Sequence, residues 1–131
     1  GDRAYRVRPG SFGGITNGGI PKNTLQIGHS CARGREHRKA LTGLGLTQHG
    51  AGWPFAVPDF FIKFLTEPGD LVADIFSGRA MTGRAAEENQ RRWICVESAL
   101  QYVRGAAELF RSSQGFWVNP ALEEAFRTSD A

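Results

Sequence analysis

The clearest hydrophobic pattern lies in the second half of the sequence, where helical and strand spacings alternate. Phe61, Phe64 and Leu65 recur at i, i+3 and i+4, which predicts an amphipathic helix over residues 59–65. Pro68, in a Pro-Gly-Asp turn, ends this helix. Four further segments follow with short turns between them: a strand at 71–74, a helix at 82–89, a strand at 93–97 and a helix at 99–111.

This order of elements predicts the fold class. The last helix carries an apolar stripe, formed by Leu100, Val103, Ala106 or Ala107, and Phe110. Strands that alternate with helices across short turns are typical of α/β proteins with a parallel sheet and right-handed crossovers. The length of 131 residues fits one domain. We therefore expect residues 1–131 to form a single α/β domain.

The first half of the chain is harder to interpret. Residues 1–22 are rich in Gly and predict a flexible loop, while 24–28 alternate weakly and predict a short strand. Residues 29–40 are polar and basic without a clear period, and 43–52 are again Gly-rich and predict a loop. At the other end, the tail from residue 112 holds three large apolar side chains that could pack back: Phe116, Trp117 and Leu122.

Charge is distributed unevenly between the two halves. The net charge is +3, but residues 1–50 carry eight Lys and Arg against two acidic residues, a net of +6. Such a basic half suits a polyanion, and the run containing Arg33, Arg35, Arg38 and Lys39 is a candidate contact for DNA phosphates. A solvated surface with uneven charge is the alternative explanation.

Composition excludes several classes of protein. No apolar run approaches the roughly 18 to 20 residues of a membrane span, and the first residues lack the apolar core of a signal peptide. The two cysteines make no disulfide framework, which indicates a reduced, cytoplasmic protein. The spacing of His29, Cys31, His37 and His49 fits no common metal site, and Cys95 in an apolar strand is expected in the core.

The strongest chemical signal is the turn after the first predicted strand. That strand ends in Asp74, and a turn of small residues leads to a helix for which Thr82 is a plausible N-cap. Gly78 lets the backbone approach a ligand closely, and the helix start offers free N–H groups. Glu97 ends the next strand, where a carboxylate can accept both hydroxyls of a ribose. The pattern predicts a site for a nucleoside-containing cofactor, or else a structural turn with two incidental acids.

Two stretches resemble a known family. Residues 67–78 read Glu-Pro-Gly-Asp-Leu-Val-Ala-Asp-Ile-Phe-Ser-Gly and resemble the cofactor motif of amino-group DNA methyltransferases, which methylate adenine N6 or cytosine N4. Residues 91–97, Arg-Arg-Trp-Ile-Cys-Val-Glu, are similar to the family's next strand. The resemblance implies a Rossmann-like fold with a mostly parallel sheet. It also implies S-adenosylmethionine as the cofactor and double-stranded DNA as the partner, in the C-terminal part of a prokaryotic or phage enzyme.

The resemblance also implies roles for particular residues. The cofactor pocket would be lined by residues of the loop and of the following strand, namely Asp74, Phe76, Ser77, Gly78, Thr82 and Glu97. Glu97 would hold the ribose, and Phe76 would stack near the adenine unless it is a core aromatic. The stretch from His49 to Pro54 would approach the methionine end of the cofactor.

The departures from the family bear on cofactor binding. The sequence has Arg79-Ala80-Met81 where the family usually has Ser-Gly-Thr, and Ile75 where it has Pro. Ala80 places a Cβ where the backbone is expected to need a positive φ, at a cost on the order of 1 kcal/mol. Arg79 places a bulky cation in the cofactor loop.

A second departure concerns catalysis. The family activates the target amine with an Asp-Pro-Pro-Tyr-type tetrapeptide, whereas the six prolines here, at 9, 21, 54, 58, 68 and 120, include no adjacent pair. We assign no catalytic residue and expect the chain alone to transfer no methyl group. It resembles a C-terminal piece, a subunit that works with a second polypeptide carrying the tetrapeptide, or a decayed gene. The alternative is a non-catalytic α/β module that binds DNA or protein.

Overall fold

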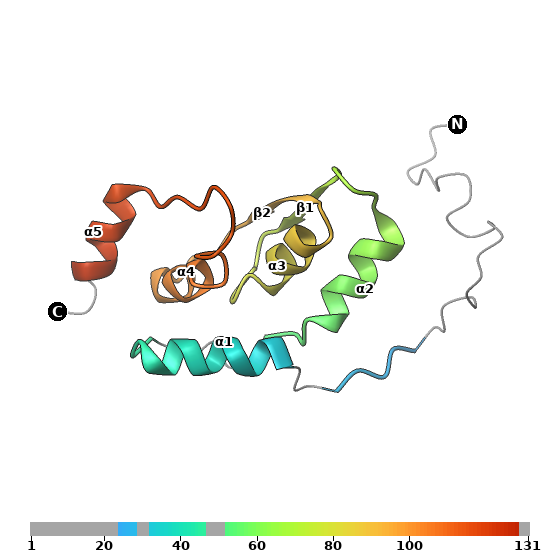
Figure 1. Ribbon diagram of the computed structural model, residues 1–131, viewed down its shortest axis with the longest axis horizontal. Helices are drawn as coiled ribbons and strands as arrows, with labels where there is room; N and C mark the ends of the chain where they lie inside the picture. Colours follow the sequence, from blue (N-terminus) through green and yellow to red (C-terminus); the bar gives the residue numbers. More distant parts are fainter. Residues whose placement is uncertain (1–23, 29–31, 47–51, 129–131) are drawn as a thin grey trace.

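The computed structural model describes residues 24–28, 32–46 and 52–128, with five helices and two strands among them (Figure 1). The elements follow one another in this order: α1 (Ala32–Gly43), α2 (Ala56–Leu65), β1 (Leu71–Asp74), α3 (Met81–Glu88), β2 (Arg92–Cys95), α4 (Leu100–Ala107) and α5 (Pro120–Thr128). None of the described helices is long and apolar enough to cross a membrane.

The two strands form the centre of the fold. β1 and β2 run parallel in a register that pairs Leu71 with Arg92 and Asp74 with Cys95, and α3 makes the crossover between them. Within the described residues the sheet has these two strands alone, so each strand has one edge without a strand partner. The predicted α/β class and parallel pairing are confirmed.

Helices α2 and α3 cover one face of the sheet, the inner face. Their apolar side chains and that of Phe55, just before α2, form a buried cluster with Ile62, Met81, Ala85 and Ala86, against which Val72 and Trp93 pack. A second cluster joins the start of α3 to α4 through Ala80, Ala106 and Phe110, and it also touches Trp93. The ring of Trp93 stacks on that of Phe110 with 4.4 Å between centroids, so Trp93 connects the two clusters.

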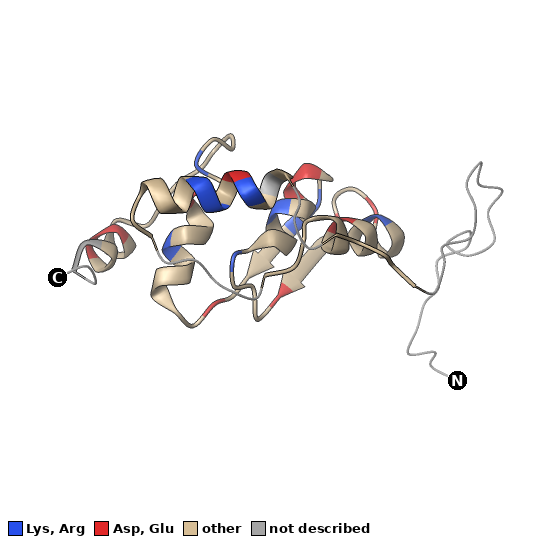
Figure 2. Cartoon of the chain, turned by 90° about the horizontal axis from the view of Figure 1, so that it is seen from below, with Lys and Arg blue, Asp and Glu red and all other residues tan. Residues whose placement is uncertain are grey.

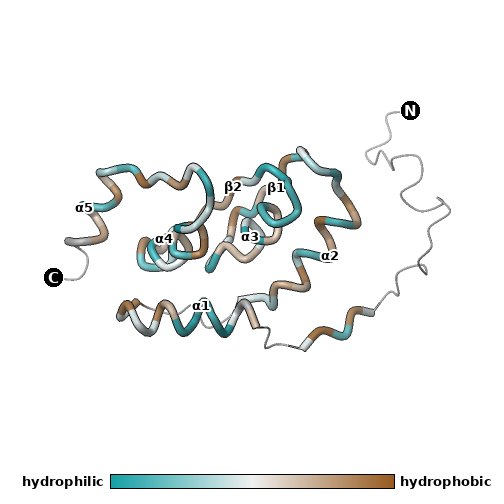
Figure 3. The backbone as a smooth tube through the Cα atoms, viewed as in Figure 1, coloured by the Kyte–Doolittle hydropathy of each residue, from teal (hydrophilic) through white to brown (hydrophobic). Residues whose placement is uncertain are grey.

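No described residue covers the opposite, outer face of the same sheet. Strand residues alternate between the two faces, so Leu71 of β1 and Ile94 of β2 point away from the helices, as do Ile75 and Val96 directly after the strands. Each of these four side chains is between 51% and 64% exposed. Both strands and α2 are rich in apolar residues, whereas α1 is hydrophilic over much of its length (Figure 3).

The predictions for the first half of the chain were partly wrong. Residues 24–28 form no strand, and the polar stretch at 29–40 includes most of α1, a helix of twelve residues. Its buried positions are Gly34, His37 and Leu41, spaced by three and four residues. Because only one of these is a large apolar side chain, the helical period is invisible in the hydrophobic pattern. Residues 1–23 lie outside the described part of the chain.

The helix predicted at 59–65 begins earlier, at Ala56, and turns a different face inward. Pro58 and Ile62 are buried, whereas Phe61 and Leu65 are 46% and 62% exposed. Pro58 is tolerated because it lies in the first turn, where its missing N–H would have no helical partner. At the other end of the chain, α4 stops at Ala107, four residues before the predicted end, and the tail contains α5, which was not predicted.

Candidate functional site

The loop from β1 to α3 has an unusual backbone. Gly78 and Ala80 both have φ of 52°, in the left-handed region, and the Ala80 N–H donates to the carbonyl of Ser77 (2.7 Å). The prediction of a positive φ at Ala80 is therefore confirmed. The prediction of Thr82 as N-cap is wrong, because α3 begins at Met81 and Ala80 precedes it.

Asp74 holds the two ends of this loop together. One carboxylate oxygen accepts the N–H of Phe76 (3.1 Å), and the other accepts the hydroxyl of Thr82 (2.6 Å). The residue that ends β1 is thereby bonded both to the loop and to the first turn of α3. Asp74 thus contributes to the site by shaping the loop.

Glu97 ties the same loop to the end of β2. Its carboxylate accepts the N–H of Gly78 (2.8 Å) and the N–H of Ala99 (2.9 Å). The N–H of Ser77 donates to the carbonyl of Val96 (3.0 Å), which adds a further link. Since a carboxylate oxygen can accept more than one hydrogen bond, Glu97 can support the loop and still face a ligand hydroxyl.

Phe76 stands apart from these contacts. Its side chain is 84% exposed, so the alternative interpretation of Phe76 as a core aromatic is wrong. Neighbouring Ile75, where the family has Pro, is also exposed at 64%. The exposed ring of Phe76 lies at the carboxyl edge of the sheet, where ligands bind in open α/β sheets.

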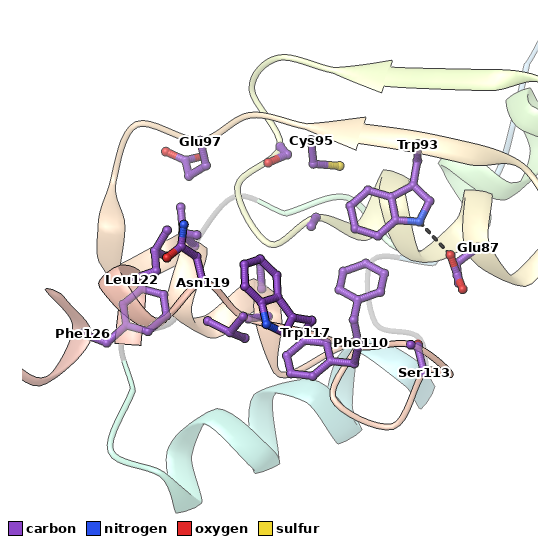
Figure 4. Close-up of a pocket in the computed structure, with 18 of the residues that line it drawn as sticks. Glu87, Trp93, Cys95, Glu97, Phe110, Ser113, Trp117, Asn119, Leu122 and Phe126 are labelled. Atoms are coloured by element: carbon purple, nitrogen blue, oxygen red, sulfur yellow. Dashed lines mark hydrogen bonds between the residues drawn. The ribbon is translucent and has the colours of Figure 1, made fainter. Parts of the chain in front are cut away.

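A cavity of about 440 Å³ extends from this edge along β2. Figure 4 shows Trp93, Cys95 and Glu97 in a row along the strand, facing Trp117 and Phe110. Ser77 and Ala80 of the loop also line the cavity. Its volume lies within the range of small-molecule sites, and its walls are mostly apolar with a few polar groups, as is usual for such sites.

The charges around this cavity are acidic. Of the described residues that line it, Glu87 and Glu97 are charged and none is Lys, Arg or His. Glu87 accepts the indole N–H of Trp93 (2.8 Å). Burial raises the pKa of the Cys95 thiol, and the negative charge of Asp74 raises it further, so Cys95 is a neutral part of the wall. The cavity thus suits a ligand with apolar and cationic parts.

The segment before α2 approaches the loop from another side. Gly52 packs against the guanidinium of Arg79, which is buried, so this predicted bulky cation points into the protein. Pro54 follows two residues later, and its carbonyl accepts the N–H of Val57 as the chain enters α2. His49 lies outside the described residues, so its predicted place near the cofactor stays a prediction.

The predicted DNA-contacting residues all lie on α1. Arg35 and Lys39 are exposed and Arg38 is half-buried, and they form the basic segments of the helix seen in Figure 2. The side chain of Arg33 is not among those described. The opposite side of α1 carries His37, whose Nε2–H donates to the carbonyl of Gly105 in α4 (3.0 Å). Burial lowers the pKa of His37.

The hydrophobic pattern did not reveal the contacts that His37 and Arg79 make inside the protein. The spacing of Gly34, His37 and Leu41 was the available signal for the first of these. No group of His, Cys, Asp and Glu side chains among the described residues is arranged to hold a metal ion. Of the four residues considered for a metal, His37 alone is described.

Comparison with known proteins identifies the family. The sequence model of the DNA methylase family N6_N4_Mtase matches residues 20–108. The chain belongs to this family. Its members are S-adenosylmethionine-dependent methyltransferases. The Rossmann-like fold and the cofactor that the motifs at 67–78 and 91–97 implied are therefore confirmed for the family.

Relatives of known name agree with this assignment. Type II methyltransferase M.PvuII of Proteus hauseri is 44% identical over 77% of this chain and 29% of its own length. Type II methyltransferase M.BglI of Bacillus subtilis is 38% identical over 43% of this chain and 16% of its own. The solved structure of PvuII DNA methyltransferase (cytosine-N4-specific) matches with a TM-score of 0.67 at 36% identity, over 82% of this chain and 37% of that one. The chain spans less than half the length of each.

Proposed function

We propose that this chain is the S-adenosylmethionine-binding portion of a DNA methyltransferase that acts on an exocyclic amine. The observation that carries the proposal is the loop at 75–80, which Asp74 and Glu97 brace beside the 440 Å³ cavity. Cytosine N4 is favoured over adenine N6, because the matched solved structure is named as cytosine-N4-specific. Because both curated relatives are type II methyltransferases, we propose that the enzyme serves in restriction-modification, in the bacterial cytoplasm.

The residues at the loop fit the chemistry of this cofactor. When bound, S-adenosylmethionine supplies the methyl group, from a positively charged sulfonium. Glu97 would accept the ribose hydroxyls, and the exposed ring of Phe76 would cover the adenine. Ser77 and Gly78 would border the cofactor through their backbone, and the segment from His49 to Pro54 would face the methionine end. The acidic lining of the cavity favours a cationic ligand.

We assign DNA contact to α1, through Arg33, Arg35, Arg38 and Lys39. On helix α1, Arg35 and Lys39 are exposed and Arg38 is half-buried, while His37 on the buried side bonds to Gly105 of α4. A row of cations on one helix neutralises several backbone phosphates and so binds double-stranded DNA with little dependence on sequence.

The catalytic group is proposed to come from a second polypeptide segment. The 131 residues contain no adjacent prolines and therefore no Asp-Pro-Pro-Tyr-type tetrapeptide. The apolar outer face of the sheet supports such a partner, since parallel sheets in α/β proteins are usually covered on both faces. The same missing tetrapeptide favours the second candidate function, a non-catalytic module that binds DNA or protein.

Titration calorimetry tests the cofactor assignment. S-adenosylmethionine and S-adenosylhomocysteine at millimolar concentration should both bind the full chain, and Glu97→Gln should weaken both. Glu124→Gln, an exposed position on α5, is the matched control and should bind as the wild type does. No heat with the wild-type chain, or equal binding by Glu97→Gln, would contradict the assignment.

Two further measurements test the DNA contact of α1 and the need for a catalytic partner. Affinity for mixed-sequence duplex DNA should fall steeply between about 50 and 200 mM salt, and Arg35→Ala should reduce the slope by roughly one while the control Lys63→Ala leaves it unchanged. With tritiated cofactor, the chain alone should leave DNA unlabelled. Label that appears after addition of a polypeptide carrying Asp-Pro-Pro-Tyr supports the enzyme, and label without it would refute the need for a partner.

A further inference from the structure

The tail that follows α4 forms one wall of the cavity beside β2. Residues 113–119 line the cavity one after another, and α5 extends the same wall. The wall that faces it follows β2 from Trp93 to Glu97, as Figure 4 shows. The sequence model of the family matches residues 20–108, so the tail lies beyond the matched part of the chain. The family motifs therefore could not indicate what this wall contributes.

The backbone on both sides of Trp117 is held in place. Before it, the N–H of Phe116 donates to the carbonyl of Ser113 (3.1 Å). After it, the side chain of Asn119 accepts the N–H of Ala121 (3.0 Å) and so caps the start of α5. The segment that carries Trp117 therefore has a defined shape against the cavity.

Trp117 differs from the other aromatic residues of the cavity in its exposure. Its side chain is 73% exposed, whereas Phe110 is buried and Trp93 is half-buried against both core clusters. An indole offers a large, rigid contact surface at a low cost in conformational freedom. The exposed surface of Trp117 adds little to the packing of the free chain, and a ligand in the cavity would cover it.

The surroundings of the cavity indicate which part of the cofactor reaches Trp117. In the proposed function Glu97 holds the ribose, from which the adenine and the methionine arm leave at different atoms. The methionine arm is assigned to the segment 49–54, and none of its described residues, 52–54, lines this cavity. The part of the cofactor that enters the cavity is therefore the adenine. A flat, mostly apolar base suits walls built from aromatic rings.

We propose that Trp117 is a binding residue for the adenine of the cofactor and stacks on the base from the tail side of the cavity. This inference rests on the proposed function and adds to it a contact that lies beyond the family motifs. Phe76 is not among the described residues that line the cavity, so Trp117 supplies an aromatic contact separate from that of Phe76.

Titration calorimetry of the full chain with two ligands tests the contact. S-adenosylhomocysteine carries the adenine and the methionine arm, whereas adenosine carries the base and the ribose alone. Trp117→Ala should lose roughly tenfold in affinity for both ligands, as expected when one stacked base loses its aromatic partner. Trp117→Phe keeps a ring and should recover most of the affinity. Phe61→Ala removes a partly exposed ring from α2, outside the cavity, and should bind as the wild type does.

Two further measurements separate a ligand contact from a structural role. Because the Trp117 side chain is largely exposed, Trp117→Ala should leave the midpoint of urea unfolding nearly unchanged. S-adenosylhomocysteine should protect the tryptophan fluorescence of the wild type from quenching by acrylamide, and Trp117→Phe should lose most of this protection. A lower unfolding midpoint in Trp117→Ala, with no recovery of affinity in Trp117→Phe, would overturn the proposal in favour of a structural role.

The remaining outcomes distinguish this inference from the proposed function. Equal affinities of Trp117→Ala and the wild type for both ligands would overturn the inference while cofactor binding stands. If Trp117→Ala instead associates more weakly with a polypeptide carrying Asp-Pro-Pro-Tyr, Trp117 is a partner contact. A loss of affinity confined to S-adenosylhomocysteine would place Trp117 at the methionine arm and refute the adenine contact. Absence of binding of either ligand by the wild type would refute the proposed function, and this inference with it.

Discussion

The two faces of the central sheet differ in what covers them. Val72 and Trp93 on the inner face are packed by α2, α3 and Phe110, while Ile94 and Val96 on the outer face are more than half exposed. The same short strands supply both sets, since successive side chains point to opposite faces. The difference teaches that one side of each strand is stabilised by the helices of this chain. The other side has the composition of a buried surface, but no residue of the described part of the chain covers it.

The sharpest test of this difference is a pair of neighbouring substitutions on β2. Trp93→Ala should destabilise the chain by about 3 kcal/mol, because it removes a large side chain shared by both clusters and leaves a cavity. Ile94→Ala, one residue further along, should cost less than about 1 kcal/mol because its side chain is already 53% exposed. Urea unfolding followed by circular dichroism measures both. Equal losses would mean that the outer face is also packed.

A smaller effect is expected where α3 crosses the inner face. A Cβ at Gly83 would come within 2.9 Å of the Cys95 sulfur and of a ring carbon of Trp93. Gly83→Ala should therefore cost about 1–3 kcal/mol, since α3 would have to move away from β2. Gly43→Ala at the end of α1 meets nothing within 4 Å and is the matched control, expected to be neutral or slightly stabilising. A harmless Gly83→Ala would show that α3 packs less closely than described.

The smallest effect concerns α1 and depends on pH. Burial holds the pKa of His37 below its ordinary value of 6.5, so the unfolded chain binds this proton more readily than the folded one. The contribution of neutral His37 is complete above pH 6.5 and is lost as the pH falls from there toward the lower, folded-state pKa. Comparing the free energy of unfolding of the wild type and of His37→Gln at a series of pH values isolates the contribution of His37. Identical pH profiles would exclude it.

The sequence pattern allowed the β1–α3–β2 unit to be predicted, because its apolar runs are short, strongly periodic and separated by turn residues. The resemblance to the family allowed the positive φ of Ala80 to be predicted, since the family has Gly there. Helix α1 escaped prediction because its inward side consists of Gly34, His37 and Leu41. The prediction of the inward face of α2 was wrong, because Phe61 and Leu65 are apolar but exposed. Hydrophobicity therefore did not distinguish the two faces of this helix.

The roles of Arg79 and Glu97 show a further limit of pattern alone. In the sequence, Arg79 is a charged residue in a loop, and nothing local indicates that it turns inward against Gly52, which is 27 positions away. Glu97 was expected to face a ribose, and its bond to Gly78 additionally makes it a support of the loop. Both contacts depend on the tertiary arrangement of segments distant in sequence.

Within the described residues, β1 and β2 each have one edge without a strand partner, and these edges bear on the fate of the protein in the cell. A parallel strand without a neighbour presents free N–H and C=O groups, and such edges pair readily with strands of other chains. Copies of the chain that have met no partner should therefore be the ones that chaperones and proteases remove first. We expect the amount of this chain in the cell to follow the amount of the partner polypeptide that covers those edges. Degradation of unpartnered copies would then set the ratio of chain to partner.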